Sequence, residues 1–484
     1  MDCEKKTASL IDAVDELFEQ ARPAFAQTRT FQRAKSLALS SLVGMGRKTI
    51  SGILCAGGQQ FMDWTAAYRL FGQQRFDCSA LFAPARTEVM QRIDSKEPLV
   101  AMLDDTLLRK RGRKITGTGW RRDPLGPPFC NNFVWAQRFV QVSAALPEDG
   151  VIGRACGIPI DLVHAPSAQK PKKTASVEQW NKYLEDQKRL RVSAVGAGRI
   201  AHLRQCMDND GSGRSRKLIV SVDGGFTNRT VFRDLPHDTA VIGRIRKDAR
   251  LYVPPKELQI TGRGRRRFYG EPLPTPQQIR QDDSIPWRKV RAYGARTLHE
   301  FDLKTLDAVR WKGTGQQNVR VVIIRPLSYR PTKKHRLLYR DPAYLLCTDP
   351  ELPLDRLLQA YLWRWEIELN FRDEKTVLGM GEAQVRTENA VQSVPAFIAA
   401  SYAFLLLAAH NSDTKPQLLP APKWRAESPA LRPTTIQIIG ALRSQLWARS
   451  LHPNLPHFPS ATIAHSKCSL FNHPFLSAAL YAFR

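Results

Sequence analysis

Two short apolar runs, each followed at once by aspartate, constrain the fold more than any other feature of the sequence. The first covers residues 99–103 and leads into Asp104 and Asp105, and the second covers residues 217–222 and leads into Asp223. Apolar runs of this length are typical of buried strands, and a sheet holds an aspartate at a strand end rigidly while its carboxylate emerges at the edge. Two carboxylates that converge there repel each other. The pattern therefore indicates a cation site, and hard oxygen ligands suit magnesium or manganese.

The remaining patterns predict a mixed α/β fold in three parts. Residues 1–95 are helical throughout, and residues 96–410 alternate strands with helices and include a β-rich insertion at about 239–343. Residues 411–484 form a Pro-rich, basic tail that we expect to pack loosely. Within the middle part, strands are predicted at 135–146, 158–163, 319–324 and 344–348, and helices at 177–207, 354–378 and 394–409. This order favours a mixed sheet with helices packed on it.

The segment from Thr30 to Gly57 is typical of a helix, a short glycine-containing turn and a second helix. The second helix begins with Arg47 and Lys48, and a helix that reads a DNA groove needs such a basic start. Two core helices with an exposed basic end explain the pattern equally well. Residues 1–95 are therefore a candidate DNA-end-binding domain, with Arg47 and Lys48 as candidate contacts.

Charge is the most unusual property of the composition. Lys and Arg number 73 against 45 acidic residues, a formal net charge of +28, and nucleic acid is the polyanion that such a field fits best. A membrane fits less well, because the apolar stretch at 394–409 is too short for a spanning helix and contains Pro395. The acidic, amphipathic N-terminus does not resemble a secretion signal, so we expect a cytoplasmic location. The eight scattered cysteines indicate neither a zinc site nor a disulfide framework.

One predicted helix carries a charged stripe between apolar ones. Tyr361, Arg364, Glu368 and Lys375 fall within roughly 60° of one another at about 100° per residue. Apolar residues flank this stripe on both sides, which is typical of a cleft wall rather than a solvated face. Taken alone, Arg364 and Glu368 are also explained as an ordinary surface pair worth about 0.3–0.5 kcal/mol.

These four residues, at these spacings, resemble the Tyr-Arg-Glu-Lys signature of bacterial insertion-sequence transposases of the DDE superfamily, in the branch that includes the Tn-five-type enzymes. The Asp-Asp-Thr at residues 104–106 is similar to the first aspartate motif of the family, in which Asp is followed by Thr. This similarity selects Asp105 over Asp104. Asp223 resembles the second aspartate, although the family often has Asp-Arg and two glycines follow Asp223 here.

The resemblance implies an RNase H-like catalytic core from about residue 98 to 410, with the β-rich insertion between the second aspartate and the glutamate helix. It implies that the chain is an endonuclease and strand transferase whose catalytic and metal-binding residues are Asp105, Asp223 and Glu368. Two Mg²⁺ or Mn²⁺ ions would serve each site. If Asp223 is not the second carboxylate, the next candidates are Asp208, Asp210 and Asp234.

The resemblance also implies DNA contacts. Arg364 and Lys375 would hold phosphates, and Tyr361 would donate a hydrogen bond to another. If a hairpin intermediate forms, a displaced base needs an aromatic shelf. Trp365 is the first candidate for this shelf, and each candidate is also explained as a core aromatic; the others are Trp287 and Trp311. Basic runs are candidates to line the DNA path: Arg109, Arg111 and the rest of 109–114, then 121–122 and 263–267.

The implied partners are double-stranded transposon ends and target DNA, bound by a homodimer of a bacterial, nucleoid-associated protein. No nucleotide cofactor is expected, because the sequence contains no phosphate-binding GxxxxGK loop. Two alternatives remain open. One is a catalytically silent DNA-binding relative, and the other is a nuclease without strand transfer, which would use the same carboxylates.

Overall fold

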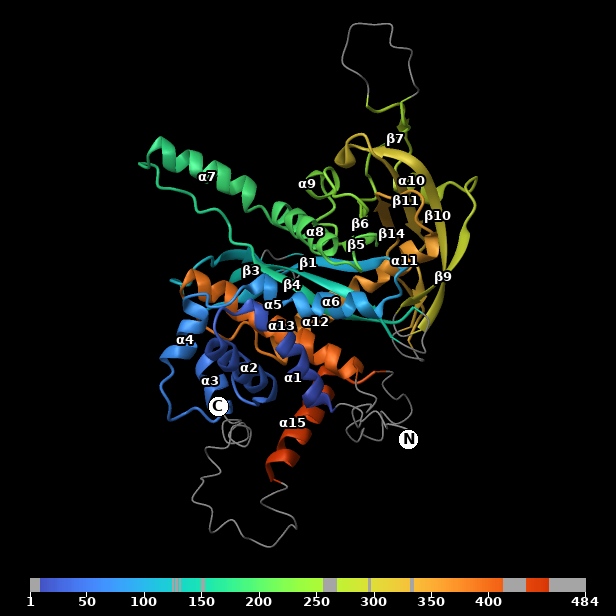
Figure 1. Cartoon of the computed structure of the whole chain (residues 1–484). Helices are drawn as coiled ribbons and strands as arrows, with labels where there is room; N and C mark the ends of the chain where they lie inside the picture. Colours follow the sequence, from blue (N-terminus) through green and yellow to red (C-terminus); the bar gives the residue numbers. More distant parts are fainter. Residues whose placement is uncertain are drawn as a thin grey trace, which may run out of the picture.

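A mixed twelve-stranded sheet organises the computed structural model, which describes residues 9–123, 126, 129, 132–148, 153–255, 268–294, 297–330, 335–411 and 432–451. The strands run in the order β2-β3-β1-β5-β6-β14-β11-β10-β7-β8, with β4 beside β3 and β9 beside β10. Helices lie on both sides of this sheet (Figure 1). The mixed α/β class predicted from the sequence is confirmed.

Five strands carry both aspartate segments. In spatial order they are β4 (Ala155–His164), β3 (Phe133–Pro147), β1 (Leu99–Arg109), β5 (Leu218–Val222) and β6 (Thr239–Arg244). The strand β3 is antiparallel to β4 and β1, whereas β5 is parallel to β1 and β6 is parallel to β5. A short strand, β2 (Gly119–Arg122), pairs with the start of β3. This topology agrees with the RNase H-like core that the resemblance implied.

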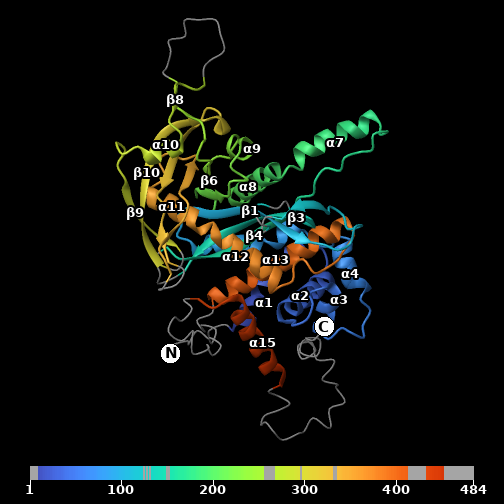
Figure 2. The same cartoon turned by 180° about the vertical axis from the view of Figure 1, so that it is seen from behind.

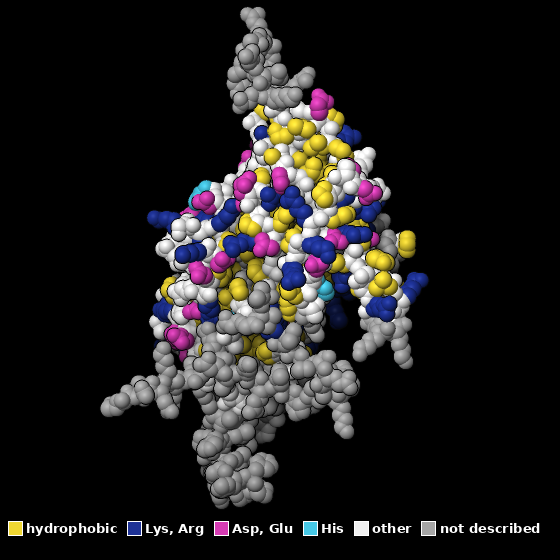
Figure 3. Space-filling view, turned by 90° about the vertical axis from the view of Figure 1, so that its right-hand side faces the viewer, with side chains coloured by type: hydrophobic (Ala, Val, Ile, Leu, Met, Phe, Trp, Pro, Cys, Tyr) yellow, Lys and Arg dark blue, Asp and Glu magenta, His cyan; other side chains and the backbone are white. Residues whose placement is uncertain are grey.

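The inserted strands extend the same sheet beyond β6. They are β14 (Ala343–Cys347), β11 (Asn318–Ile324), β10 (Thr297–Trp311), β9 (Arg288–Gly294), β7 (Leu251–Tyr252) and β8 (Pro272–Leu273). The insertion also contains α10 (Pro276–Gln281), η2 (Lys312–Thr314) and a separate pair, β12 (Ser328–Tyr329) with β13 (Leu338–Tyr339). Residues 239–244, expected within the insertion, form β6 of the core. Figure 3 shows basic and acidic side chains interspersed over the face on which β9 and β10 lie.

The N-terminal helices share their core with a helix from the far end of the chain. They are α1 (Leu10–Gln20), η1 (Arg22–Ala24), α2 (Thr28–Val43), α3 (Ile50–Ala56), α4 (Thr65–Gly72), α5 (Cys78–Leu81) and α6 (Ala83–Arg92). They gather around α13 (Glu388–Asn411), as Figures 1 and 2 show from opposite sides. The ring of Phe18 meets Phe404 edge-on with 5.3 Å between centroids. The N-terminal helices therefore pack against the part of the chain that contains the sheet and α13.

The helix α13 is the most apolar helix among the described residues. Residues 388–410 are long and apolar enough to cross a membrane, with a mean hydropathy of 1.7, but 94% of the most apolar window is buried within the fold. Gln392 of this helix accepts a hydrogen bond from His164 N and donates one to Leu162 O, which satisfies backbone groups of β4. The helix is a core element, as the sequence indicated for residues 394–409.

Several predicted helices differ from the structure. The helix expected at 177–207 divides into α7 (Val177–Arg189), which projects from the body and buries no residue, and α8 (Val192–Asn209). The helix expected at 354–378 divides into α11 (Leu354–Trp363) and α12 (Trp365–Thr376). A four-residue helix, α9 (Arg229–Phe232), follows β5. The C-terminal part, expected to pack loosely, includes α15 (Thr435–Leu451), whose apolar side chains Ile438, Ile439, Leu442 and Leu446 are buried.

The two faces of the sheet bury different side chains of β1. Leu99, Ala101 and Leu103 belong to the larger core, which includes α8, α13 and the N-terminal helices. Val100 and Met102 belong to a smaller core with α11 and α12. Over residues 99–103 this alternation follows from the two-residue period of a strand. It does not hold along the whole of β1, because Leu108 also belongs to the larger core.

Candidate active site

The register of β1 and β5 places Asp104 and Asp223 on the face covered by α11 and α12. Met102 pairs with Ser221 in the parallel ladder, and Ser221 Oγ donates to Ala360 O of α11 at 2.8 Å. Asp104 and Asp223 each follow these residues by two positions. Alternation along the strands therefore places both aspartates on the same face. Contrary to the expectation of a strand end, β1 continues to Arg109, so Asp104 lies inside the strand.

Arg364 joins the β1 carboxylate to the helix carboxylate. Its Nη1 lies 3.1 Å from Glu368 Oε1 and 3.7 Å from Asp104 Oδ2. The side chain of Arg364 is only 12% exposed, whereas that of Glu368 is 34% exposed. The guanidinium of Arg364 is thus the buried end of the site, and the carboxylates of Asp104 and Glu368 approach it from the more exposed side.

Asp105 lies on the other face of the strand. Its Oδ2 is 3.2 Å from Nε of Arg138 on β3, and both side chains are a little more than one quarter exposed. The structure therefore separates the two adjacent aspartates: Asp104 meets Arg364, and Asp105 meets Arg138. Burial raises the pKa of Asp105, the charge of Arg138 lowers it and that of Asp223 raises it. The charge of Asp105 in turn raises the pKa of Asp104.

Burial and mutual repulsion disfavour the ionised forms of the carboxyl groups in this site. Burial raises the pKa of Asp104 to about 7, with further increases from the charges of Asp105 and Asp223, while a backbone hydrogen bond and Arg364 oppose them. Burial also raises the pKa of Glu368, and Asp223 adds to this effect against Arg364. Like charges gathered in a poorly solvated site favour a bound cation. The donor chemistry of this group fits a hard divalent ion.

The cluster is not a preformed metal cage. Within the residues that the structure describes, no group of three or more His, Cys, Asp or Glu side chains has the arrangement of a metal site. Arg364 lies between the carboxylates of Asp104 and Glu368 instead. A cation bound by these carboxylates would share them with the guanidinium.

The four residues of the charged stripe lie along a helix that bends at Arg364. The backbone N–H of Arg364 donates to Tyr361 O at 3.2 Å and that of Ile367 donates to Arg364 O at 3.3 Å, both spanning three residues rather than four. Burial raises the pKa of Tyr361, and the charges of Arg364 and Arg244 oppose this. Lys375 is exposed in the last turn of α12, and its charge acts on Asp105.

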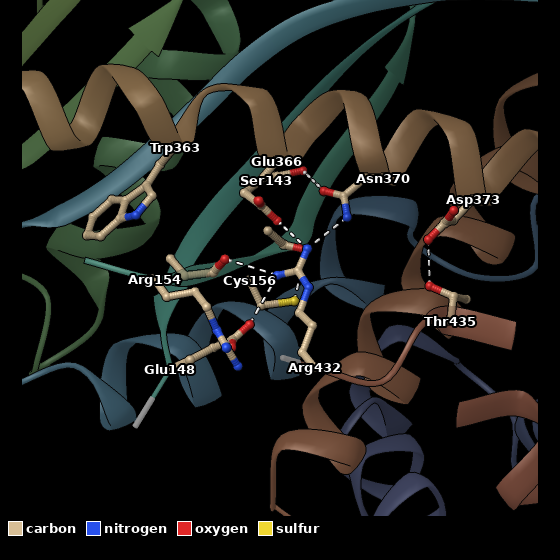
Figure 4. A network of polar contacts seen from close by, with 12 residues as sticks. Ser143, Glu148, Arg154, Cys156, Trp363, Glu366, Asn370, Asp373, Arg432 and Thr435 are labelled. Carbon is tan, nitrogen blue, oxygen red and sulfur yellow. Dashed lines mark hydrogen bonds and ion pairs between the residues drawn. The ribbon is translucent and has the colours of Figure 1, made fainter. Parts of the chain in front are cut away.

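Arg432, just ahead of α15, ties α12 to β3 and β4 (Figure 4). Its Nη1 lies 3.1 Å from Glu148 Oε1 and donates to Ala155 O at 3.1 Å, and its Nη2 lies 2.7 Å from Glu366 Oε2. Glu148 pairs with Arg154 as well. Because Glu366 precedes Glu368 by two residues, these contacts fix the start of the helix that carries the candidate carboxylate.

A second contact holds α12 directly against β4. Asn370 Nδ2 donates to Gly157 O at 2.9 Å, and Asn370 Oδ1 accepts from Ser143 Oγ at 2.9 Å. A methyl group added at Gly157 would lie 2.9 Å from Glu366 Cβ. Only glycine allows this approach of helix and strand.

The other predicted DNA contacts occupy different environments. Trp365 is 58% exposed at the start of α12. Arg109 is exposed and pairs with Asp123 at 2.8 Å, and Arg111 is exposed nearby. Trp311 packs edge-on against Phe232 with 5.9 Å between ring centroids. Trp287 lies beneath the cations of Lys304 and Arg325, and the run at 263–267 falls outside the described residues.

Lys48 does not present its charge to solvent, which corrects its selection as a DNA contact. Its side chain is buried, and Nζ donates to Ser41 O at 2.5 Å and to Gly44 O. Glu382 Oε2 accepts a hydrogen bond from Lys48 N at 2.6 Å. The lysine thus satisfies the carbonyls at the end of α2, a role that the sequence pattern does not distinguish from groove reading. Arg47 is exposed.

The sequence missed three further residues around Asp104. Arg138 pairs with Asp105, Gln141 lies opposite Asp104 in the β3 ladder, and buried Glu374 of α12 interacts with Gln141. The face of Asp104 can be found from the alternation of side chains along β1. Met102, two residues earlier, lies beside Ser221, and Ser221 contacts α11. No local pattern marks these three residues, because the antiparallel pairing of β3 brings Arg138 and Gln141 there and the packing of α12 brings Glu374.

Comparison with known families gives one match. Residues 22–317 match the model of a family described as DDE superfamily endonuclease, which is more than half of the chain. The matched segment includes Asp104, Asp105 and Asp223 and ends before Glu368. Among curated proteins, none matches the chain.

Proposed function

The chain belongs to the DDE superfamily of endonucleases, and we propose that within it the protein is a DNA transposase whose three carboxylates are Asp104, Asp223 and Glu368. The observation that carries this proposal is the contact of Arg364 with both Asp104 and Glu368 on the sheet face to which Asp223 also belongs. A transposase needs such a convergence of carboxylates from separate elements, because its metal ions take their ligands from all of them.

We select Asp104 over Asp105, which the family resemblance favoured. The alternation of β1 supports this choice, because Asp104 shares a face with Glu368 and Asp105 faces Arg138. Asp105 keeps a role as a nearby negative charge whose ion pair holds Arg138 in place. Single substitutions of Asp104 and of Asp105 distinguish the two assignments.

Endonucleases of this superfamily generally use divalent metal ions, and the carboxylates of the site would hold two Mg²⁺ or Mn²⁺ ions. Such ions, when bound, activate the attacking oxygen and stabilise the leaving oxygen of a phosphoryl transfer. Arg364 orients Asp104 and Glu368 and offsets part of their repulsion. The exposed ammonium of Lys375 binds a DNA phosphate as a point charge.

The finer assignment is to the branch with the Tyr-Arg-Glu-Lys signature. The placement of Tyr361, Arg364, Glu368 and Lys375 along one bent helix supports it. The exposure of Trp365 supports its role as the shelf for a displaced base if hairpin ends form. We further propose that residues 1–95 contribute to binding DNA ends, with Arg47 as a contact, and that a dimer pairs two ends.

The test is cleavage of the DNA that borders this gene's own element, with and without Mg²⁺. Wild type should cut only with the ion, and Asp104→Asn, Asp223→Asn and Glu368→Gln should each reduce cutting to background while retaining DNA binding. Asp105→Asn should retain measurable cutting. Loss of cutting in Asp105→Asn with activity retained in Asp104→Asn would return the assignment to Asp105.

Strand transfer needs its own measurement. A DNA end with a labelled, exposed 3′-hydroxyl, incubated with plasmid and wild-type protein, should give labelled plasmid product. Cutting without joined product would favour a nuclease, and DNA binding with no cutting by wild type would favour a silent relative.

A further inference from the structure

A basic pocket lies beside the second aspartate and is not part of the carboxylate site. It has a volume of about 1070 Å³ and opens between the end of β6 and the inserted strands. Gly224, which follows Asp223, forms one wall, and Trp311 and Tyr344 form others. The pocket therefore lies at the carboxyl ends of β5 and β6, next to Asp223 in the chain.

Positive charge dominates the lining of this pocket. It contains four basic residues, Arg244, Arg246, Lys247 and Arg280, against two acidic ones, Asp248 and Asp341. Arg246 is already paired, because its Nη2 lies 2.9 Å from Asp248 Oδ2. Arg244 and Lys247 are exposed and, within the described part of the chain, form no ion pair. Two cations are thus free to take an anionic ligand.

The position of Arg244 links the pocket to the carboxylates. In the parallel ladder of β5 and β6, Val222 pairs with Gly243, so Asp223 and Arg244 follow at neighbouring strand ends. Alternation from Ile242, which belongs to the core with α11, directs Arg244 to the same face as Asp223. Its charge also acts on Tyr361 of the stripe. A strand whose reacting phosphate lies at the carboxylates would pass Arg244 next.

Hydrogen bonds hold the pocket residues in a fixed framework. Gln277 N donates to Lys247 O at 3.0 Å, and Gln277 Oε1 accepts from Tyr344 Oη and from Arg280 Nε. Ile245 N donates to Tyr344 O at 2.8 Å. The basic segment is thereby anchored to β14 and α10. Preorganised cations lose less entropy on binding than those of a free loop.

We propose that this pocket, through Arg244 and Lys247, binds successive phosphates of the DNA strand that leaves the carboxylates on the Asp223 side. The inference rests on the proposed function, because it takes the DNA at the carboxylates as given. Phosphate contacts of this kind position the strand and carry no base preference. Duplex DNA and an unpaired strand offer the same phosphodiester chemistry, so the experiment must distinguish them.

The experiment measures DNA affinity in a Glu368→Gln background, in which cutting does not interfere. The double variant Arg244→Gln/Lys247→Gln is compared with Arg288→Gln/Arg291→Gln, a matched loss of two exposed charges on β9. Fluorescence anisotropy is recorded over a range of salt with two labelled DNAs, a blunt duplex and a duplex with a single-stranded extension. Thermal unfolding identifies any variant that fails to fold, and the single variant Lys247→Gln, with half of the expected change in slope, then replaces the double variant.

The pocket variant should lower the slope of log affinity against log salt by about 2, since each lost phosphate contact removes about 0.9. The β9 control should leave the slope unchanged. A loss confined to the extended DNA assigns the pocket to an unpaired strand, and an equal loss with both DNAs assigns it to duplex. Equal slopes for pocket and control variants overturn the inference, even if wild type cuts DNA. If the pocket variant has a reduced slope but the wild-type protein never cuts DNA, the pocket is still a DNA-binding site and the proposed function is wrong.

Discussion

The guanidinium of Arg364 lies 3.1 Å from the carboxylate of Glu368, one turn further along the same bent helix. Such a pair on an exposed helix would contribute little to stability. Here the same nitrogen also approaches Asp104 at 3.7 Å, and the arginine side chain is 12% exposed. The contact therefore connects two elements that are far apart in sequence, and its value lies in orienting the carboxylates.

Arg364→Lys should lower the rate of DNA cutting more than it weakens DNA binding. Lysine keeps the charge but has no planar fork with which to meet Asp104 and Glu368 together. We expect at least about a tenfold fall in kcat, which corresponds to about 1.4 kcal/mol in the barrier, with a smaller change in KM. Arg372→Lys is the control, because Arg372 lies on α12, is 61% exposed and pairs with Asp373. Full activity in Arg364→Lys would show that charge alone suffices.

Gly157→Ala should destabilise the protein and displace α12. The added methyl would lie 2.9 Å from Glu366 Cβ and 3.0 Å from Asn370 Oδ1, so helix or strand must move. Overpacking of this kind costs about 1–3 kcal/mol, which urea unfolding would measure. Gly119→Ala is the matched control on β2, where an added methyl meets nothing within 4 Å. An unchanged midpoint in Gly157→Ala would mean that α12 is not held closely against β4.

Arg432→Met and Glu366→Gln should be coupled in a double-mutant cycle. Removing Arg432 takes away the cation that pairs with both Glu148 and Glu366. Breaking a buried ion pair in this way lowers the free energy of unfolding by about 3–5 kcal/mol. These side chains are 11% to 32% exposed, so we expect the lower end of this range. The double variant should lose less stability than the two single losses added together. Simple additivity would mean that the two residues act independently.

The sequence predicted four strands of the core, which became β1, β3, β4 and β5, because their apolar runs are distinct. Runs at 99–103 and 217–222 became parts of β1 and β5. The continuation of β1 through its two aspartates was missed. The parallel ladder with β5 ends at Leu103, but the antiparallel ladder with β3 continues through Asp104 and Asp105 to Arg109, so the two aspartates do not end the strand.

Long-range pairing accounts for most other differences. The predicted helix at 354–378 covers α11 and α12, but its bend at Arg364 was not predicted. Arg432 was assigned to a loosely packed tail because Pro-rich, basic composition dominates its neighbourhood. Its ion pairs with Glu148 and Glu366 exist only in the assembled fold. The spacing of residues along the helix was thus enough to identify the charged stripe. The face of the sheet on which Asp104 lies could be found only from the pairing of β1 with β5.

Glu374→Gln should stabilise the protein increasingly as the pH rises. Burial raises the pKa of Glu374 to about 8 from an ordinary value of 4.5, and the neighbouring side chain of Gln141 opposes this. Between these two values the folded protein keeps a proton that the unfolded chain has released. The stability contributed by this group is therefore full below about pH 4.5 and falls as the pH rises to about 8. Glutamine stays neutral and avoids that loss.

Urea unfolding at several values between about pH 5 and 8 would measure the effect. The free energy of unfolding of Glu374→Gln minus that of wild type should increase steadily over this window, by up to a few kcal/mol. Glu185→Gln on the exposed helix α7 should show no such trend, because its carboxylate is solvated in both states. A difference independent of pH would mean that Glu374 is already ionised in the fold. The buried side chain beside Gln141 would then need a cation from Lys375, which would draw that lysine away from DNA.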